Sequence, residues 1–140
     1  VDVKGSFAFF GSKGYLILAL KNILLNAAKY SKTGSRVILF ASFEENSHWF
    51  RVKDFGRGIP EAAIANIFDP FFRVEPSRNR AEGGVGIGLS LTLALIKTHQ
   101  GTIDVKSEEK KGTTFLVTLP NLVKKPQKIA NIFIKKNFAK

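Results

Sequence analysis

Residues 82–90 form the stretch of this sequence with the clearest capacity for chemistry. They read Glu-Gly-Gly-Val-Gly-Ile-Gly-Leu-Ser, so that four glycines fall within six positions. Glycine lacks a Cβ atom, and such a backbone adopts positive φ angles and lets a ligand approach closely. Apolar residues at helical spacing follow over residues 89–99. A glycine loop that leads into a helix N-terminus offers free N–H groups to an anion such as phosphate, although a plain glycine-rich turn is the alternative for the loop alone.

Two well-known phosphate motifs do not fit this loop. A P-loop needs a lysine where Leu89 stands. A dinucleotide fingerprint needs a strand before the glycines and an acidic residue about 20 residues later, whereas a polar stretch with Arg73, Arg78 and Arg80 precedes this loop. Those arginines suit an anionic ligand in their own right.

A polar stripe on an apolar helix, expected over residues 15–32, is the second chemical signal. Asn22, Asn26 and Lys29 are spaced i, i+4, i+7, which puts them on one helix face, with Tyr30 beside them. An amide oxygen is a hard ligand that suits Mg²⁺, and a lysine one turn away would meet phosphate. A solvated helix face accounts for the stripe equally well.

Asp54 is the third candidate. In a strand expected over residues 48–55 it shares side-chain parity with Val52, so its carboxylate points where the apolar side chains point. Because a buried carboxylate needs a hydrogen-bond donor, an adenine amino group is a suitable ligand; a carboxylate that reaches back to water is the alternative. Thr113, inward-facing after Gly112, could bridge to Asp54 directly or through water. Residues 54–56 also spell the metal-binding tripeptide of protein kinases, but no other kinase motif accompanies it.

The elements that must position these residues alternate along the chain. We expect strands over residues 3–10, 36–44, 48–55, 102–107 and 113–119, and helices over residues 15–32, 61–67 and 89–99. The long stretch 69–84 has little periodicity and is typical of a functional lid. Because the strands pair in hairpins, we predict an α+β fold. Its form would be a two-layer α/β sandwich with a mixed, mostly antiparallel sheet of about five strands and three helices on one face.

Composition restricts the function classes. A chain of 140 residues is one domain. It has no apolar run of bilayer length, and the absence of cysteine excludes a disulfide scaffold and fits a reducing compartment. The sequence has no Met and begins at Val1, so we expect it to be a piece of a longer protein.

The net charge of +11 is uneven, because the last twenty residues carry six Lys and no acid. We treat residues 1–120 as the domain and residues 121–140 as a basic tail. Such a charge run is usually solvated, and Ile129, Ile132 and Phe133 show helical spacing. We expect the tail to be disordered or weakly docked. Nucleic acid and anionic lipid are chemically suitable partners for this tail, but we do not favour either. We expect the protein to bind no nucleic acid.

Five motifs in this order resemble the ATP-binding catalytic domain of sensor histidine kinases, within the gyrase/MutL/histidine-kinase ATPase superfamily. Residues 22–31 look like the N box, 54–59 like the first glycine box, and 67–73 like the F box. Residues 82–90 look like the second glycine box and 112–115 like the last. The resemblance covers residues 1–120 and implies the ATP-binding fold known as the Bergerat fold.

The resemblance also implies a role for each matched position. Asn26 would bind Mg²⁺ and the nucleotide, Tyr30 would lie against the nucleotide, and Asp54 would accept a hydrogen bond from the adenine amino group. The groups expected to act at the phosphates are Asn22, Lys29 and Arg73. The other nucleotide-binding positions are Gly56, Gly58, Ile59, Gly84, Val85, Gly86, Ile87, Gly88, Leu89 and Thr113. Val85 stands where the family usually has Thr and Ile87 where it has Leu; backbone contacts make both acceptable.

The function that follows is transfer of the γ-phosphoryl group of Mg-ATP to a histidine on a dimerisation and phosphotransfer domain of the same parent protein. A response-regulator receiver domain would be the next partner. His48 and His99 lack the acceptor context and are expected to be structural or exposed. We expect a monomeric fragment that is the cytoplasmic portion of an inner-membrane sensor. An anti-sigma-type serine kinase, a degenerate nucleotide-sensing module and a basic module acting through residues 124–140 are the alternatives.

Overall fold

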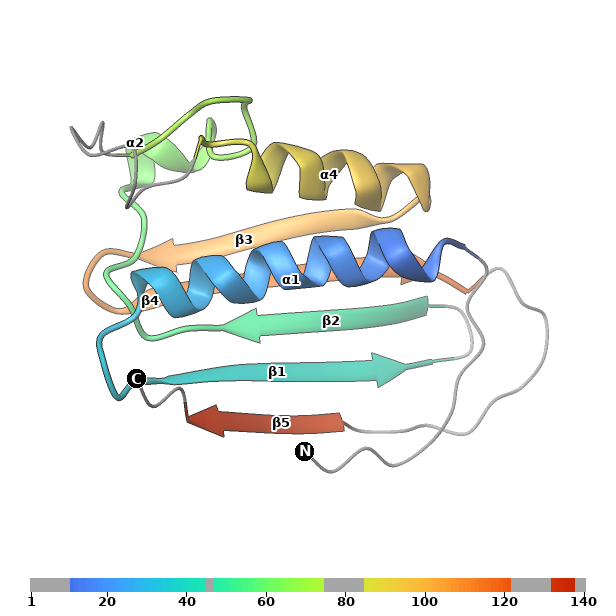
Figure 1. Cartoon of the computed structure of the whole chain (residues 1–140), viewed down its shortest axis with the longest axis horizontal. Helices are drawn as coiled ribbons and strands as arrows, with labels where there is room; N and C mark the ends of the chain where they lie inside the picture. The colour runs from blue at the N-terminus through green and yellow to red at the C-terminus, as the bar shows by residue number, and fades with distance from the viewer. Residues whose placement is uncertain (1–10, 45–46, 75–84, 122–131, 138–140) are drawn as a thin grey trace.

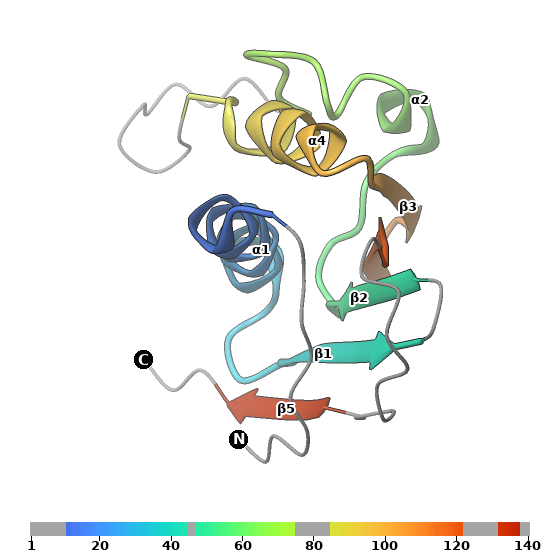
Figure 2. The same cartoon turned by 90° about the vertical axis from the view of Figure 1, so that its right-hand side faces the viewer.

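The computed structural model describes residues 11–44, 47–74, 85–121 and 132–137. Its elements are α1 (Lys13–Tyr30), β1 (Arg36–Phe43), β2 (Ser47–Lys53), α2 (Glu61–Ile64), α4 (Gly88–Thr98), β3 (Thr102–Glu108), β4 (Gly112–Pro120) and β5 (Ile132–Asn137). A five-stranded sheet forms one layer, and the helices lie over one of its faces (Figures 1 and 2). The predicted α+β two-layer sandwich is confirmed. The strand predicted over residues 3–10 lies outside the described residues.

The strand order is β3-β4-β2-β1-β5. The sequence predicts a mixed, mostly antiparallel sheet, and every pairing between described strands is antiparallel. The register aligns Leu39 with Val52, Val52 with Phe115, and Phe115 with Val105. These residues form one row across four strands on the face that the helices cover, because side chains alternate between the two faces of a strand.

The basic tail differs from its prediction. Residues 132–137 form β5, which pairs with β1 from Arg36 opposite Asn137 to Ala41 opposite Ile132. For these six residues the expectations of disorder and of helical spacing are therefore wrong, whereas the tail does dock on the body, as a strand. An edge strand leaves a row of N–H and C=O groups without partners, and β5 supplies those partners along β1. Ile129 lies outside the described residues.

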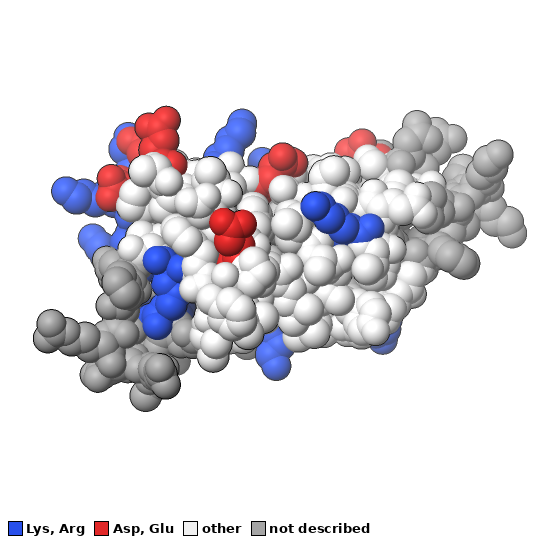
Figure 3. Space-filling view, turned by 90° about the horizontal axis from the view of Figure 1, so that it is seen from above, with Lys and Arg blue, Asp and Glu red and all other residues white. Residues whose placement is uncertain are grey.

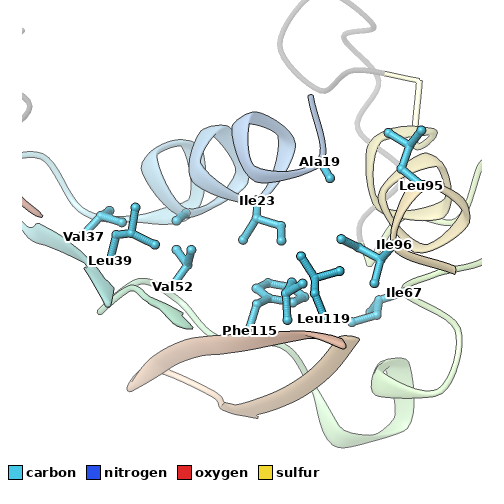
Figure 4. Close-up of a cluster of buried hydrophobic side chains, with 12 residues drawn as sticks. Ala19, Ile23, Val37, Leu39, Val52, Ile67, Leu95, Ile96, Phe115 and Leu119 are labelled. Carbon is cyan, nitrogen blue, oxygen red and sulfur yellow. The ribbon is translucent and has the colours of Figure 1, made fainter. Parts of the chain in front are cut away.

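The helices and the sheet enclose a single main core. Its buried side chains are Ala19, Ile23, Ala27, Val37, Leu39, Val52, Ile67, Leu95, Ile96, Phe115, Val117 and Leu119 (Figure 4). They come from α1, α4 and the inner faces of β1, β2 and β4, joined by Ile67 after α2. Within α1 the buried positions are spaced by four residues, so one stripe of the helix rests on the sheet.

A histidine fixes the two long helices to one another. The backbone N–H of Ser12, the N-cap of α1, donates to His99 Nε2 at 3.1 Å, and His99 Nδ1 lies 2.7 Å from the Leu95 carbonyl oxygen in α4. One ring nitrogen accepts and the other donates, as a neutral imidazole requires. His99 and His48 are both buried, which agrees with the structural role expected of them.

Element boundaries differ from the predictions by a few residues. α1 begins at Lys13 and ends at Tyr30, two residues earlier at each end than predicted. Its start is set by Ser12, whose hydroxyl accepts a hydrogen bond from the Tyr15 N–H. β2 ends at Lys53, so Asp54 follows the strand. α2 has four residues, fewer than the seven predicted. Within the described parts of the chain, no helix has the length and apolarity needed to cross a bilayer.

Candidate functional site

One pocket of about 650 Å³ gathers nearly all the residues singled out in the sequence. It lies between the C-terminal half of α1, the loop after β2, the segment after α2 and the start of α4. Its lining includes these sequence-predicted residues: Asn22, Asn26, Lys29, Tyr30, Asp54, Gly58, Ile59, Arg73, Val85, Gly86, Ile87, Gly88, Leu89 and Thr113. Gly56 is not in the lining, and Gly84, Arg78 and Arg80 lie outside the described residues.

Asp54 is the buried acid of this pocket, with 5% of its surface exposed. Its Oδ1 accepts from the backbone N–H groups of Gly56, at 2.9 Å, and of Thr113, at 3.1 Å. Within the described residues no hydrogen bond reaches Oδ2. Burial raises the pKa of the Asp54 carboxyl above its ordinary value, and the two backbone hydrogen bonds oppose that shift. One carboxylate oxygen is therefore held by the protein, and the other remains for a donor from a ligand.

Two glycines let the loop after Asp54 pass between neighbouring backbones. A Cβ on Gly56 would overlap the Tyr30 carbonyl oxygen at the end of α1. Gly58 has φ +72°, and a Cβ there would overlap the Glu108 carbonyl oxygen. Gly56 thus shapes the pocket without lining it, because it brings the loop against α1 and its N–H donates to Asp54. The predicted close backbone approach occurs here between parts of the protein.

The polar stripe of α1 faces the pocket. Asn22 is half-buried, and its side-chain Nδ2 donates to the Gly88 carbonyl oxygen at 3.2 Å and to Thr92 Oγ1 at 3.4 Å. Asn22 therefore joins α1 to the first turn of α4, and its amide oxygen is left for the pocket. Asn26, one turn further, is also half-buried and makes no side-chain hydrogen bond to any described residue. Its amide oxygen is the group in this stripe best suited to a cation.

The N-terminus of α4 closes the same wall. Gly88 and Leu89 line the pocket, and the N-cap residue, Ile87, makes no side-chain cap hydrogen bond. Side-chain caps normally satisfy the first N–H groups of a helix. Here these groups and the positive end of the helix dipole are available to an anion, as the glycine loop predicts.

The opposite rim consists of residues 71–74 packed on residues 85–87. The Phe71 N–H donates to the Gly86 carbonyl oxygen at 3.0 Å, and Gly86 has φ +79°. A Cβ on Gly86 would lie 2.9 Å from the backbone of Phe71 and Phe72. Arg73 lines the pocket from this rim. Phe71 and Val85 are 67% and 68% exposed, so this rim has little of the packing found around Asp54.

Thr113 contacts Asp54 in a way that the sequence did not suggest. Its backbone N–H donates to the carboxylate and its carbonyl oxygen accepts from the Asp54 N–H. The hydroxyl lies 2.9 Å from Ser107 Oγ, its partner across the β3–β4 pair, and no direct hydroxyl bond to Asp54 forms. Ser107 in turn accepts from the Ile59 N–H at 2.8 Å. The alternating pattern of residues 102–107 puts Ser107 on the inner face, and that was the available signal for it.

Several lining residues were not among the predicted site residues: Leu25, Ala27, Arg57, Ile67, Phe72, Val74 and Phe115. Most are apolar, as the walls of small-molecule pockets usually are. Arg57 is the charged exception, and its position in a loop carries no periodic signal. Within the described residues, no three His, Cys, Asp or Glu side chains are grouped as a metal site.

A second hollow, of about 440 Å³, lies under the N-terminal half of α1. Its lining is Gly11, Lys13, Leu16, Ile17, Ala19, Leu20, Ile23, Phe50, Ile96 and Val117. Only Lys13 carries charge, and none of the predicted site residues is present. The chemistry suggested by the sequence therefore belongs to the pocket around Asp54.

Comparisons with known proteins agree with this geometry. The sequence profile of the family described as "Histidine kinase-, DNA gyrase B-, and HSP90-like ATPase" matches residues 11–123. The sensor protein SrrB of Staphylococcus aureus is 39% identical over 101 residues, which are 72% of this chain and 17% of SrrB. The chain thus spans about a sixth of the length of that relative.

Solved structures share this fold. The mycobacterial sensor histidine kinase MprB superposes with a TM-score of 0.70 at 29% identity, covering 80% of this chain and 76% of MprB. Full-length ShkA in complex with AMPPNP superposes with a TM-score of 0.65 at 30% identity, covering 76% of this chain and 21% of ShkA.

Proposed function

The chain belongs to the family of histidine kinase-, DNA gyrase B- and HSP90-like ATPases, and from that premise we propose that it binds Mg-ATP and donates the γ-phosphoryl group to a histidine of a partner domain. The observation that carries the proposal is the pairing of groups in one pocket. A buried carboxylate with one oxygen held by the protein faces the same hollow as an uncapped helix N-terminus. The first suits an adenine amino group and the second a phosphate chain.

At the base end, Asp54 accepts a hydrogen bond from the adenine amino group through Oδ2. Guanine carries an oxygen at the corresponding ring position, and an oxygen facing a carboxylate has no proton to share. Ile59 and Phe72 line the same pocket and enclose the flat base. The site therefore selects adenine over guanine nucleotides.

At the phosphate end, the N–H groups that begin α4 hold the phosphate chain, together with Lys29 and Arg73, two of the three cations in the described lining. Asn26 would hold Mg²⁺ through its amide oxygen. The metal, when bound, would supply neutralisation of the charge on the phosphates. Phosphoryl transfer requires mainly positioning and charge neutralisation, and this set provides both.

The nucleophile must come from another domain. Asn22 has no group that takes a proton from water, so the site hydrolyses ATP slowly and keeps the phosphoryl group for transfer. The two histidines of the chain are 3% and 8% exposed. In the transfer, the bond between the γ-phosphorus and the bridging oxygen breaks, a phosphorus–nitrogen bond forms to the acceptor imidazole, and ADP leaves.

A sparsely charged surface is available for that acceptor domain. Broad white areas separate the acidic and basic side chains on the face seen in Figure 3. Leu18 and Leu25 on α1 and Leu91 on α4 are large apolar residues exposed to solvent. We assign this face to the dimerisation domain of the parent protein, whose phosphohistidine then serves a response regulator in the cytoplasm.

A transfer assay tests the proposal. The chain is incubated with γ-labelled Mg-ATP and a separately purified dimerisation domain from a sensor kinase, and the product is treated with acid and with base. Acid-labile, base-stable label on the added domain is expected, with none when Asn26→Ala replaces the wild type. Acid-stable label on serine would favour the anti-sigma-type kinase. Binding of ATP without any transfer to a set of such domains would favour the nucleotide-sensing module.

A further inference from the structure

The backbone of Arg57 is held by two hydrogen bonds, although the residue lies in a loop. Its N–H donates to the Tyr30 carbonyl oxygen at 3.2 Å, and its carbonyl oxygen accepts from the Lys110 N–H at 2.6 Å. Gly56 and Gly58 on either side are squeezed against those same neighbouring backbones. The loop therefore holds residue 57 between the end of α1 and the β3–β4 turn, and the position of its Cα atom is restricted.

The Arg57 side chain lies on an aromatic ring of the pocket. Its guanidinium carbon is 4.6 Å from the centroid of the Tyr30 ring, and Lys29 Nζ is 5.1 Å from the same centroid. All three residues line the pocket. Tyr30 is 39% exposed and is the last residue of α1, so few contacts within the helix restrict its ring. The guanidinium is one of the groups that hold it.

We propose that Arg57 is a positioning residue for the nucleotide base: by lying on Tyr30 it holds that ring as the platform for adenine. The inference rests on the proposed function. A ring that is already ordered loses less conformational entropy when a base settles on it. A planar guanidinium stacks on an aromatic face better than a lysine ammonium does. Arg57 thus acts on the base, through Tyr30, and its effect is independent of the phosphates.

Binding measurements on four proteins test this role: the wild type, Arg57→Ala, Tyr30→Leu and the double variant. Arg57→Ala should weaken the binding of both ATP and adenosine by about two- to fivefold, the scale of an exposed cation–π contact. The loss should persist in 0.5 M salt. In the Tyr30→Leu background, Arg57→Ala should cause no further loss, because the two residues act as one unit. Arg57→Lys should restore part of the affinity.

The chain provides a matched control in Lys53. Its Nζ lies 5.0 Å from the centroid of the Phe55 ring, a contact of the same kind between the end of β2 and the loop that contains Arg57, but neither residue lines the pocket. Lys53→Ala should leave nucleotide affinity unchanged. Backbone hydrogen bonds at residue 57 survive the substitution to Ala, and circular dichroism with a thermal melt checks the fold.

Three results would overturn the inference. One is an additive loss in the double variant. Another is a loss seen for ATP but not adenosine that disappears at high salt, which would mean that Arg57 contacts phosphate. The third is unchanged affinity in Arg57→Ala. A wild-type chain that binds no adenine nucleotide would defeat the proposed function first, and that result is distinguishable because it needs no variant.

Discussion

The two ends of the pocket each contain a glycine with a positive φ angle, 72° at Gly58 and 79° at Gly86, in very different surroundings. Around Gly58 the nearest atoms are the backbone of Glu108 and Glu109 at the β3–β4 turn. Around Gly86 they are the backbone of Phe71 and Phe72, on a rim where Phe71 and Val85 are more than 60% exposed. The same local conformation is thus supported by packed backbone at one end and by an exposed segment at the other.

This difference suggests that the two ends of the pocket contribute differently to folding and to binding. The base end holds Asp54 with two backbone hydrogen bonds and is shaped before any ligand arrives. The phosphate end has helix N–H groups and exposed side chains, and a ligand would complete it. Substitutions at the base end should therefore affect folding as much as binding, whereas those at the phosphate end should affect binding more than folding. Four changes test this, in order of expected effect.

The largest effect is expected from Gly58→Ala. A left-handed conformation costs a non-glycine residue about 1–2 kcal/mol, and the new Cβ would also overlap the Glu108 carbonyl oxygen in a hairpin that cannot move freely. We expect a loss of at least about 2 kcal/mol in the free energy of unfolding, measured by urea denaturation. A variant as stable as the wild type would contradict the claim that the backbone around Gly58 is tightly packed.

Gly86→Ala is the counterpart at the other end. A Cβ there would lie 2.9 Å from the backbone of Phe71 and Phe72, so the rim must move, but the overlap is smaller than the one that a Cβ on Gly58 would make with the Glu108 carbonyl oxygen. We expect a loss of about 1–2 kcal/mol in stability, the cost of the left-handed conformation and less than for Gly58→Ala, together with at least about a tenfold loss in ATP affinity, because the loop before α4 no longer keeps its shape. Adenosine, which lacks phosphates, should bind with nearly unchanged affinity and serves as the control ligand. An equal loss for both ligands would contradict this difference between the two ends.

Asp54→Asn tests how much folding stability is lost by burying an ionisable carboxyl, separately from the role of that carboxyl in binding. Burial raises the pKa of the Asp54 carboxyl in the folded state, so stability due to its neutral form is present below the ordinary value of 3.8 and is lost as pH rises through the raised pKa. Asn keeps an oxygen for the Gly56 and Thr113 N–H groups and never ionises. The variant should therefore gain stability relative to the wild type between pH 4 and pH 7. Thermal melts across that range measure it, and a gain that shrinks with rising pH would contradict the argument.

Val85→Thr should have the smallest effect. Val85 is 68% exposed on the phosphate rim, and the added hydroxyl offers one more hydrogen bond to phosphate, worth about 0.5–1 kcal/mol at most. We expect ATP affinity to rise by no more than about fivefold and stability to stay within about 0.5 kcal/mol. Titration with ATP checks the first and a melt the second. A large change in stability would mean that this rim is more tightly packed than its exposure indicates.

Residues whose placement depends on local periodicity were predictable from the sequence. The polar stripe of Asn22, Asn26 and Lys29 required only helical spacing, and all three line the pocket. The inward direction of Asp54 followed from strand parity, although β2 ends one residue before it. The helix that follows the glycine loop begins at Gly88, one residue from its predicted start.

What the sequence did not predict depends on contacts between distant segments. Arg57 meets Tyr30 only because the loop after β2 passes beneath the end of α1. The Thr113 hydroxyl bonds Ser107 because the hairpin register puts them opposite each other. β5 exists because β1 has an edge to pair with, whereas six lysines in the tail indicated solvent. Local pattern alone carries none of these relations.

The most direct test of the account is calorimetric titration of Mg-ATP into the wild type and into Asp54→Asn under identical conditions. One ATP should bind per wild-type chain, and the affinity of the variant should be lower by at least about tenfold, the scale of a lost charge-assisted hydrogen bond, with the fold intact. Equal affinities in the two proteins, or no binding to the folded wild type, would contradict the claim that this pocket recognises adenine through Asp54.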